Sequence, residues 1–576
     1  MSKRPNVIFV LTDDQGYGDL ACTGNPNIKT PNIDAFYGDC ARFSDFHVAP
    51  LCAPTRGALM TGRRPLRNGV WATCWGRSIL KHGEYTIAEC LSDNGYNTGM
   101  FGKWHLGDNY PSRPEDKGFE RVVAHKGGGV GQTPDFWGNN YFDDTYFANG
   151  KPTEYEGYCT DVWFDQAKKF ILDNKDSDKP FFAYIATNAP HGPYLVDEKY
   201  STQYKNNPDI VNPEFYGMIT NIDENFGRLR DFLQENNLED DTILMFMTDN
   251  GTSAGFNRDE NYFVKCGFNA GMRGAKGSYY EGGHRVPFFM RWKNGNITGG
   301  YDIESLSMAT DFFPTIAELC GADNKRAGEL DGVSLVPQIK GEKQGTRTEF
   351  LQYRQDTVIP EKWTNAVLRD EWRLISGTEL YNVKDDPEQR NDIADKHPEI
   401  VKSMRKAHEI WWDEIYEDVQ KYSSIVLGND AENPAVLNAM DVLGDVAWHH
   451  VMVASNADTA GKWYVKFDQK GKYRISLMRW PEEINKRINE AMAQEEIEKL
   501  APYLKLRMTA LDESIKYQKV TLNLFGKDYE KEIEENDTEI TFIVDVDSLE
   551  ETVLTGQFVY DNDKHTGVYY ATVERL

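Results

Sequence analysis

Val7-Ile8-Phe9-Val10-Leu11-Thr12-Asp13-Asp14 and Ile243-Leu244-Met245-Phe246-Met247-Thr248-Asp249-Asn250 are the two stretches that decide the fold. Each is an uninterrupted apolar run that ends in Thr-Asp. Apolar runs without polar alternation are typical of strands buried on both faces, as in a parallel sheet covered by helices. The sequence therefore predicts two closely similar parallel strands whose carboxyl ends carry acidic side chains.

Two further β-rich runs follow the same design. Residues 98–102 lead to Lys103-Trp104-His105, and residues 181–185 lead to Ala189-Pro190-His191. This alternation of strands and helices predicts an α/β/α sandwich, in which ligands bind outside the carboxyl ends of the strands. The helical patterns between the runs cover residues 86–94, 161–174 and 216–235.

Four residues at the strand ends offer only oxygen ligands. They are Asp13, Asp14, Asp249 and Asn250. Calcium and magnesium prefer such hard ligands, whereas zinc would prefer His or Cys among them. Asp-Asp and Asp-Asn are also common turn residues after strands. Because two matching units occur, we interpret them as a metal site.

The segment Cys52-Ala53-Pro54-Thr55-Arg56 places a thiol where a helix is predicted to begin. Proline suits the first helical turn, since its fixed φ and missing N–H cost nothing there. A helix N-terminus favours an anionic nucleophile and a bound sulfate or phosphate. A buried structural cysteine is the alternative interpretation. A thiol phosphatase with a C-x(5)-R loop is excluded, because Ala58 stands six residues after Cys52.

Residues 52–63 resemble the sulfatase signature C-x-P-x-R-x(4)-T-G-R, and residues 273–287 are close to that family's R-G-x-K-G-x-x-x-E-G-G-x-R-V-P. The similarity runs from Asn6 to about residue 420. It implies a formylglycine-dependent, arylsulfatase-like type I sulfatase with the fold of the alkaline phosphatase superfamily. It further implies a bacterial carbohydrate sulfatase with a C-terminal β-sandwich extension. A maturation enzyme would oxidise Cys52 to formylglycine (3-oxoalanine).

The resemblance also assigns residues to the site, position by position. The metal, calcium or alternatively magnesium, would be held by Asp13, Asp14, the modified Cys52, Asp249 and Asn250. The catalytic residues that it implies are Cys52, Arg56, Lys103, His105, His191 and Lys276.

A covalent mechanism comes with the resemblance. One hydroxyl of the formylglycine hydrate attacks sulfur, while a protonated His191 or Lys276 supplies the proton of the departing alcohol. Arg56 fixes the hydrate, and the metal and the lysines neutralise the sulfate. His105 then deprotonates the second hydroxyl, so that the covalent sulfo-enzyme collapses to the aldehyde and inorganic sulfate.

Aromatic and polar residues near the motifs favour a sulfated saccharide over a flat, hydrophobic sterol. His284 replaces the small or apolar residue expected at its place in the family motif. The glycine-rich segment 126–132 lacks G-K-[ST], so we assign it to the wall of the cleft. The predicted substrate contacts are Trp75, Arg77, His125, Trp137, Asn140 and His284.

Composition limits the partners. The 576-residue chain is 40% hydrophobic and 27% charged, with a formal net charge of -27. That charge argues against nucleic acid as a partner, because phosphate binding needs a basic surface. The apolar residues 7–11 are too few for a signal peptide or a membrane span. The compartment stays open: the periplasm or the exterior if a signal was removed, and otherwise the cytoplasm.

Three units are predicted along the chain. Residues 1–345 form the catalytic α/β domain and 346–426 a small α+β subdomain, with a strand at 365–374 and a helix at 397–418. A linker at 427–434 leads to an appended β-sandwich at 435–576. Aromatic residues in this last unit predict carbohydrate binding if they form an exposed row, and a buttress if they are buried.

The expected activity is hydrolysis of the O-sulfate groups of a sulfated saccharide. Two alternatives stay open. One is a phosphonate or phosphodiester hydrolase of the same superfamily, which can use the same formylglycine. The other is a non-catalytic protein that binds sulfated glycans.

Overall fold

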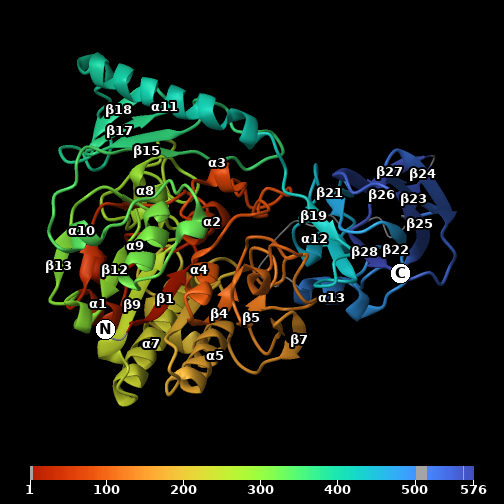
Figure 1. Ribbon diagram of the computed structural model, residues 1–576, viewed down its shortest axis with the longest axis horizontal. Helices are drawn as coiled ribbons and strands as arrows, with labels where there is room; N and C mark the ends of the chain where they lie inside the picture. The colour runs from red at the N-terminus through yellow and green to blue at the C-terminus, as the bar shows by residue number, and fades with distance from the viewer. Residues whose placement is uncertain (1–3, 501–515, 562) are drawn as a thin grey trace.

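Residues 4–500, 516–561 and 563–576 are described by a computed structural model of the chain. An α/β part and a β-rich C-terminal part lie side by side (Figure 1). Residues 1–3 of the first predicted unit, and 501–515 and 562 of the last, lie outside the described residues. No helix of the described residues is both long and apolar enough to cross a bilayer.

A ten-stranded sheet lies at the centre of the α/β part. Its middle strands run parallel, and the two apolar runs, 7–11 and 243–247, are neighbours, paired from Asn6↔Thr242 to Thr12↔Thr248. In order across the sheet the strands are β13 (Tyr301–Ile303), β2 (Ala41–Phe43), β12 (Phe288–Arg291), β9 (Thr242–Thr248), β1 (Asn6–Thr12), β8 (Phe181–Ala186), β4 (Asn97–Lys103), β5 (Arg121–His125), β6 (Thr145–Ala148) and β7 (Lys151–Glu154).

Helices cover both faces of this sheet, because its central strands are apolar on both sides. Val7, Phe9 and Leu11 of β1 join one core cluster, and Ile8 and Val10 join another. This confirms the predicted α/β/α sandwich. The helices of the first cluster are α2 (Cys52–Thr61), α4 (Ile87–Asp93) and α9 (Phe312–Leu319); those of the second are α1 (Pro31–Tyr37), α5 (Cys159–Asn174) and α7 (Pro213–Glu235).

A four-stranded antiparallel sheet follows, and the long helix α11 (Pro398–Val419) packs on it. The single strand predicted at 365–374 is wrong, because the chain forms a hairpin there. Asp370 takes a φ of 48°, in the left-handed region that such turns require. The strands are β15 (Thr348–Leu351), β16 (Ala366–Arg369), β17 (Trp372–Ile375) and β18 (Glu379–Asn382).

Two sheets form the C-terminal β-sandwich around their own core. Its first strand lies at Ile425–Leu427, so the unit starts before the expected linker. Trp463, Trp480 and Tyr569 are 2% exposed or less, so they pack the core and form no exposed row. The strands are β19 (Ile425–Leu427), β20 (Ala435–Asn438), β21 (Lys462–Phe467), β22 (Gly471–Met478), β23 (Lys519–Leu524), β24 (Lys527–Glu532), β25 (Ile540–Val546), β26 (Thr552–Tyr560), β27 (Lys564–Gly567) and β28 (Tyr570–Arg575).

Shorter elements connect these units. The short helices are α3 (Pro65–Asn68), α6 (Glu198–Ser201), α8 (Glu281–His284), α10 (Val336–Ile339), α12 (His450–Ala454) and α13 (Gln494–Leu500). Two pairs of short strands complete the description: β3 (Phe46–His47) pairs with β14 (Ser307–Met308), and β10 (Phe256–Arg258) pairs with β11 (Val264–Gly267).

Candidate active site

Three buried carboxylates meet at the carboxyl ends of β1 and β9. The two strands are parallel and in register, so Asp13 and Asp14 come to lie beside Asp249. Each offers a ligand oxygen, and these oxygens all lie within 4.8 Å of one another. The backbone N–H of Asp14 donates to Asp249 Oδ1 over 3.0 Å. The residues that the sequence placed at separate strand ends thus form one compact acidic group.

Two oxygens at this place lack a hydrogen-bond donor among the described residues. They are Asp13 Oδ1 and Asn250 Oδ1, and both residues are fully buried. An unsatisfied buried oxygen costs about 1–3 kcal/mol, so these atoms fit a ligand supplied from outside the chain. A calcium or magnesium ion suits the donors, because both ions prefer carboxylate and amide oxygens. The acidic group could therefore hold a divalent metal.

Helix α2 begins at Cys52, as predicted, and Arg56 lies one turn further along it. The buried guanidinium of Arg56 donates to Asp249 Oδ2 over 2.8 Å from Nη2 and over 3.2 Å from Nε. It also donates to the carbonyl oxygen of Lys103 over 3.1 Å. Arg56 therefore ties the start of the helix, and with it Cys52, to the acidic group. Burial raises the pKa of the Cys52 thiol, so the unmodified side chain stays neutral.

Two lysines bring positive charge to the same carboxylates. Lys103, at the end of β4, places its Nζ 2.7 Å from Asp13 Oδ2, and Lys276 Nζ lies 2.7 Å from Asp14 Oδ1. Together with Arg56 they set three cations against three carboxylates. Such pairing compensates for the cost of burying the charges.

The charges shift the pKa values of the acids in opposite directions. Although burial opposes ionisation, Lys276 holds the pKa of Asp14 well below its usual value. Burial and the neighbouring Asp13 raise the pKa of Asp249 to about 7. A bound divalent cation would favour the ionised form of both carboxylates.

Histidine 105 faces Cys52. Its Nδ1 lies 3.5 Å from Cys52 Sγ, and its Nε2 donates to the carbonyl oxygen of Thr73 over 3.0 Å. With the proton assigned to Nε2, the lone pair of Nδ1 points toward residue 52. Burial, followed by the charge of Lys103, holds the pKa of His105 well below its usual value. The ring is therefore neutral and can accept a proton.

His191 approaches the acidic group from the connection after β8. Its Nε2 lies 3.6 Å from Asp14 Oδ2, while its Nδ1 donates to the carbonyl oxygen of Gly192 over 2.6 Å. Burial lowers the pKa of His191 to about 4, although Asp14 opposes this shift. The ring is therefore neutral when no further anion is present.

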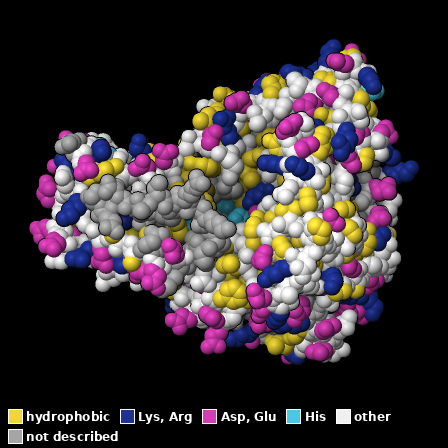
Figure 2. All heavy atoms as spheres, turned by 180° about the vertical axis from the view of Figure 1, so that it is seen from behind, with side chains coloured by type: hydrophobic (Ala, Val, Ile, Leu, Met, Phe, Trp, Pro, Cys, Tyr) yellow, Lys and Arg dark blue, Asp and Glu magenta, His cyan; other side chains and the backbone are white. Residues whose placement is uncertain are grey.

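An open cavity of about 680 Å³ reaches Cys52, and His105, His191 and Lys276 line it. Figure 2 shows a hollow between the α/β part and the C-terminal part, with a histidine side chain at its base. Gly128 and Gln132 line the cavity, so the glycine-rich segment forms part of its wall, as predicted. A Cβ on Gly128 would lie 2.3 Å from the ring of His105, so only glycine permits this approach.

Of the predicted substrate contacts, Trp75 lines the cavity and Arg77 does not. Arg77 is 2% exposed, and its guanidinium lies over the rings of Trp71 and Tyr422 at 4.7 and 3.3 Å. It therefore stabilises the packing beneath the cavity wall. Two neighbours in sequence thus have different surroundings.

Trp137 and Asn140 also fall outside the lining of the cavity. The ring of Trp137 stacks on His450 at 4.5 Å and meets Trp480 edge-on at 5.7 Å. Asn140 belongs to a turn, in which its Oδ1 accepts from the N–H of Phe142 over 3.3 Å. Both side chains are used for packing or for a turn rather than for the cavity.

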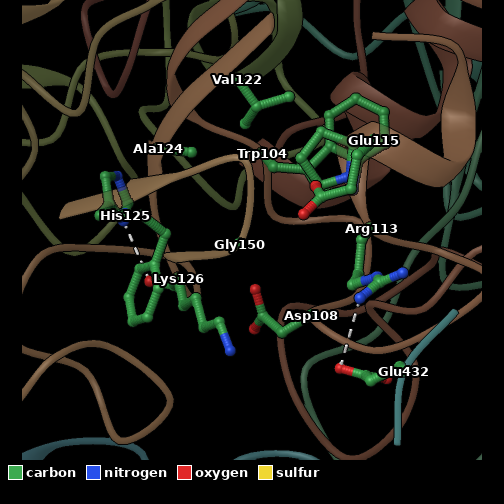
Figure 3. A pocket seen from close by; sticks show the side chains of 12 residues that line it. Trp104, Asp108, Arg113, Glu115, Val122, Ala124, His125, Lys126, Gly150 and Glu432 are labelled. Atoms are coloured by element: carbon green, nitrogen blue, oxygen red, sulfur yellow. Dashed lines mark hydrogen bonds and ion pairs between the residues drawn. The ribbon is translucent and has the colours of Figure 1, made fainter. Parts of the chain in front are cut away.

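His125 lines a separate pocket of about 70 Å³ (Figure 3). Its Nδ1 bonds to the carbonyl oxygen of Lys126 over 3.0 Å, and an ion pair of 3.9 Å between Arg113 and Glu432 lies across the pocket. Among the described residues the two pockets share no lining residue. The structure therefore does not bring His125 to Cys52.

His284 lies in a second buried group with His47 and Glu281. Its Nε2 donates to the carbonyl oxygen of Tyr279 over 3.0 Å, and its Nδ1 lies 2.9 Å from Nδ1 of His47, which requires one proton between the rings. Burial lowers the pKa of His284 to about 3, so the Nδ1 of His284 is the acceptor in this contact. Helix α8 turns His284 toward β3, so it does not line the cavity that Lys276 lines.

Several cavity residues were missed by reasoning from the sequence. Gln355 lines the cavity from the region of the four-stranded sheet. Asp445, Trp448 and Asp458 come from the C-terminal unit. These three lie in connections around α12 without periodicity or motif, so no signal marked them.

Comparison with known proteins gives consistent matches. Residues 5–322 match the family model described as Sulfatase, and residues 275–411 match N-sulphoglucosamine sulphohydrolase, C-terminal. Human arylsulfatase A is 30% identical over 383 residues, covering 61% of this chain and 71% of its own length. Dog N-acetylgalactosamine-6-sulfatase is 29% identical over 380 residues, covering 62% and 69%. The crystal structure of Ps i-CgsB in complex with k-i-k-neocarrahexaose gives a TM-score of 0.64 at 27% identity, covering 73% of this chain and 95% of that one.

Proposed function

The chain belongs to the sulfatase family, and we propose that it hydrolyses O-sulfate esters of a saccharide with residue 52 as the nucleophile. One observation carries the proposal: a group of buried carboxylates, three cations and a neutral histidine converge on Cys52 at the wall of an open cavity. A sulfate ester needs such surroundings, because its negative charge repels nucleophiles until it is neutralised.

Two groups that the sequence does not encode would complete the site. Asp13, Asp14, Asp249, Asn250 and residue 52 would hold calcium, or magnesium in its place, which neutralises the sulfate and polarises sulfur. Formylglycine, produced from Cys52 by a formylglycine-generating enzyme, would supply the attacking hydroxyl and a second hydroxyl for sulfate release. Cys52 Sγ stands in for the reactive oxygen in the distances given above.

The cationic side chains would bind and orient the sulfate. With the carboxylate oxygens committed to a bound metal, Lys103 and Lys276 would be free to donate to sulfate oxygens. Although burial opposes it, Asp14 raises the pKa of Lys276, so this lysine keeps its proton. Arg56, held by Asp249, would keep residue 52 in place throughout.

Proton transfer would fall to the two histidines. His105 Nδ1, with its free lone pair 3.5 Å from Cys52 Sγ, is placed to act as the base. His191 is the better proton donor for the departing alcohol, because a sulfate ester beside it would raise its pKa from about 4. Lys276 then serves for binding rather than for proton transfer.

We further propose that the sulfate ester belongs to a saccharide. The dog relative is named for an N-acetylgalactosamine sulfate, and Ps i-CgsB was solved with a neocarrahexaose. In this chain the cavity offers the Trp75 ring and the side-chain amides of Gln132 and Gln355. Aromatic rings and amides are typical of sites that bind sugars.

Sulfate release by the matured enzyme tests this function. Mass spectrometry first measures the fraction of residue 52 converted to formylglycine, and release is then assayed on defined sulfated oligosaccharides and on 4-nitrophenyl sulfate. Cys52→Ala, which keeps the fold but lacks the nucleophile, should release no sulfate. Undiminished release by Cys52→Ala would contradict the assignment of residue 52.

The alternative activities have their own readouts. Phosphate and phosphonate esters of the same alcohols are assayed in parallel, and a preference for them would replace the sulfate assignment. Tight binding of sulfated glycans without release, at full conversion of residue 52, would instead indicate a binding protein.

A further inference from the structure

The cavity at Cys52 has a second wall, which comes from the C-terminal unit. We call it the far wall and define it by Asp445, Trp448 and Asp458. The two family models that match this chain end at residues 322 and 411, so the far wall lies outside both. The residues at the Cys52 end of the cavity lie within the ranges that the family models match, whereas the far wall belongs to the C-terminal unit, which neither model covers.

Backbone hydrogen bonds hold the far wall in place. The N–H of Thr133 donates to the carbonyl oxygen of Trp448 over 3.1 Å, and the N–H of His450 donates to that of Gly131 over 3.3 Å. The N–H of Trp75 donates to the carbonyl oxygen of Met440 over 3.1 Å. The same glycine-rich segment packs on His105. The far wall is therefore fixed relative to the reacting groups rather than loosely tethered.

Trp448 lines this cavity with an exposed aromatic side chain. It is 37% exposed and is the one tryptophan among the exposed large apolar residues of the described chain. Trp463 and Trp480 of the same unit are buried in the sandwich core. An exposed tryptophan that lines a cavity can stack against the apolar face of a sugar ring.

The two carboxylates give the far wall its charge. Asp445 and Asp458 are exposed, and neither side chain has a hydrogen bond or ion pair within the described residues. Lys276 is the one lysine or arginine among the described residues that line the cavity. The described lining of the cavity therefore carries a lysine at the Cys52 end and two carboxylates at the far wall.

We propose that the far wall binds the sugar that is linked to the sulfated sugar and leaves with it as part of the alcohol. The far wall selects an uncharged sugar that bears hydroxyl groups. Trp448 stacks on the ring, and Asp445 and Asp458 accept hydrogen bonds from its hydroxyls. A carboxylate or a second sulfate on this unit would be repelled by both aspartates. The inference rests on the proposed function, since it takes the Cys52 end as the reacting end.

Charge selection is tested with two matched substrates. Both carry the same sulfated sugar, linked to a neutral sugar in one and to a uronic acid in the other, and kcat/KM is measured for each. The double variant Asp445→Asn/Asp458→Asn should raise kcat/KM for the uronic acid substrate about threefold per charge removed. This gain should shrink at high salt, because the carboxylates are exposed. Asp547→Asn, an exposed aspartate outside the cavity lining, is the control and should change neither value.

Stacking is tested with Trp448→Ala. We expect kcat/KM for the neutral disaccharide to fall roughly tenfold, mainly through KM, while 4-nitrophenyl sulfate, which carries no second sugar, keeps its rate. Tyr416→Ala, which removes an exposed ring on α11, is the control. An unchanged melting temperature shows that the variant is folded.

The outcomes separate this inference from the proposed function. If matured wild-type protein releases sulfate from none of the esters, the proposed function fails. If the wild type is active but Trp448→Ala and the double aspartate variant leave every kcat/KM unchanged, the far wall does not bind the sugar linked to the sulfated sugar. A wild-type preference for the uronic acid substrate would overturn the charge selection.

Discussion

The described residues contain two buried groups of potential metal ligands, and they differ in what surrounds them. The acidic group, Asp13, Asp14 and Asp249, lies at the ends of β1 and β9, beside the cavity at Cys52. The histidine group, His47, Glu281 and His284, lies at α8 and β3. Both are fully buried and both bring three ligand atoms within 4.8 Å of one another. Residue type and burial alone would rank them as equals.

The partners of each group separate them. In the histidine group, Asp45 binds the Nε2 of His47 over 2.8 Å, and Arg373 donates to Glu281 Oε1 over 2.7 Å. Within the part of the chain that the structure describes, Glu281 Oε2 has no hydrogen bond but lies 3.9 Å from Arg285. Among the described residues none of this group lines the cavity at Cys52. A buried charged cluster thus becomes a candidate site when it keeps unsatisfied donors or acceptors and adjoins a cavity.

The sharpest test of this contrast is the effect of Asp13→Asn on activity. The amide keeps the shape of the side chain but loses the charge that faces Lys103 and that the proposed metal would need. We expect kcat for 4-nitrophenyl sulfate to fall by on the order of 10³-fold, since one electrostatic contact to the transition state is commonly worth that much. Sulfate release is measured at equal formylglycine content.

The matched variant is His284→Gln in the histidine group. Its amide can still accept from His47 and donate to the carbonyl oxygen of Tyr279, so the fold should survive. Because this residue does not line the cavity, kcat per folded molecule should stay within about twofold of the wild type. A large loss of kcat in a folded His284→Gln protein would show that the two groups are coupled.

How far the sequence predicts the fold follows from the strength of its patterns. The apolar runs of β1 and β9 can be buried only between two helical layers, so the sandwich and the meeting of their acidic ends were predictable. The hairpin at Asp370 was not predictable. Two short strands joined by a tight turn resemble one strand when no glycine marks the turn. The start of the last unit was missed because β19 is only three residues long.

The candidate site likewise has residues that were predictable from the sequence and residues that were not. Residues at strand ends, such as Lys103 and Asp249, were brought together because parallel strands end at one edge. The far wall could not be predicted, because Trp448 reaches the cavity through packing between units that are distant in sequence. His284 was misplaced for the opposite reason. It is close to Lys276 in sequence, but a turn of helix directs it elsewhere.

Metal removal is the next test of the contrast between the groups. Added calcium should stabilise the wild-type protein, by about 2.7 kcal/mol at 100 times Kd, because the ion binds the folded site. A chelator should reverse this rise in melting temperature. Asp13→Asn should abolish the calcium response, whereas His284→Gln should retain it. A response lost in His284→Gln and retained in Asp13→Asn would move the metal to the histidine group.

The smallest expected effect is the dependence of stability on pH in the histidine group. Burial lowers the pKa of His284 to about 3 in the folded protein, whereas an unfolded chain binds this proton near its usual value of about 6.5. The folded state therefore loses stability as pH falls below 6.5, by about 1.4 kcal/mol per pH unit, or about 2 kcal/mol by pH 5. His284→Gln removes this contribution, so the melting temperature of the variant should fall less steeply than that of the wild type between pH 7 and 5. Parallel curves would mean that His284 already binds its second proton in the folded state. The group would then contain a charged His284 rather than a neutral His284 that accepts from His47.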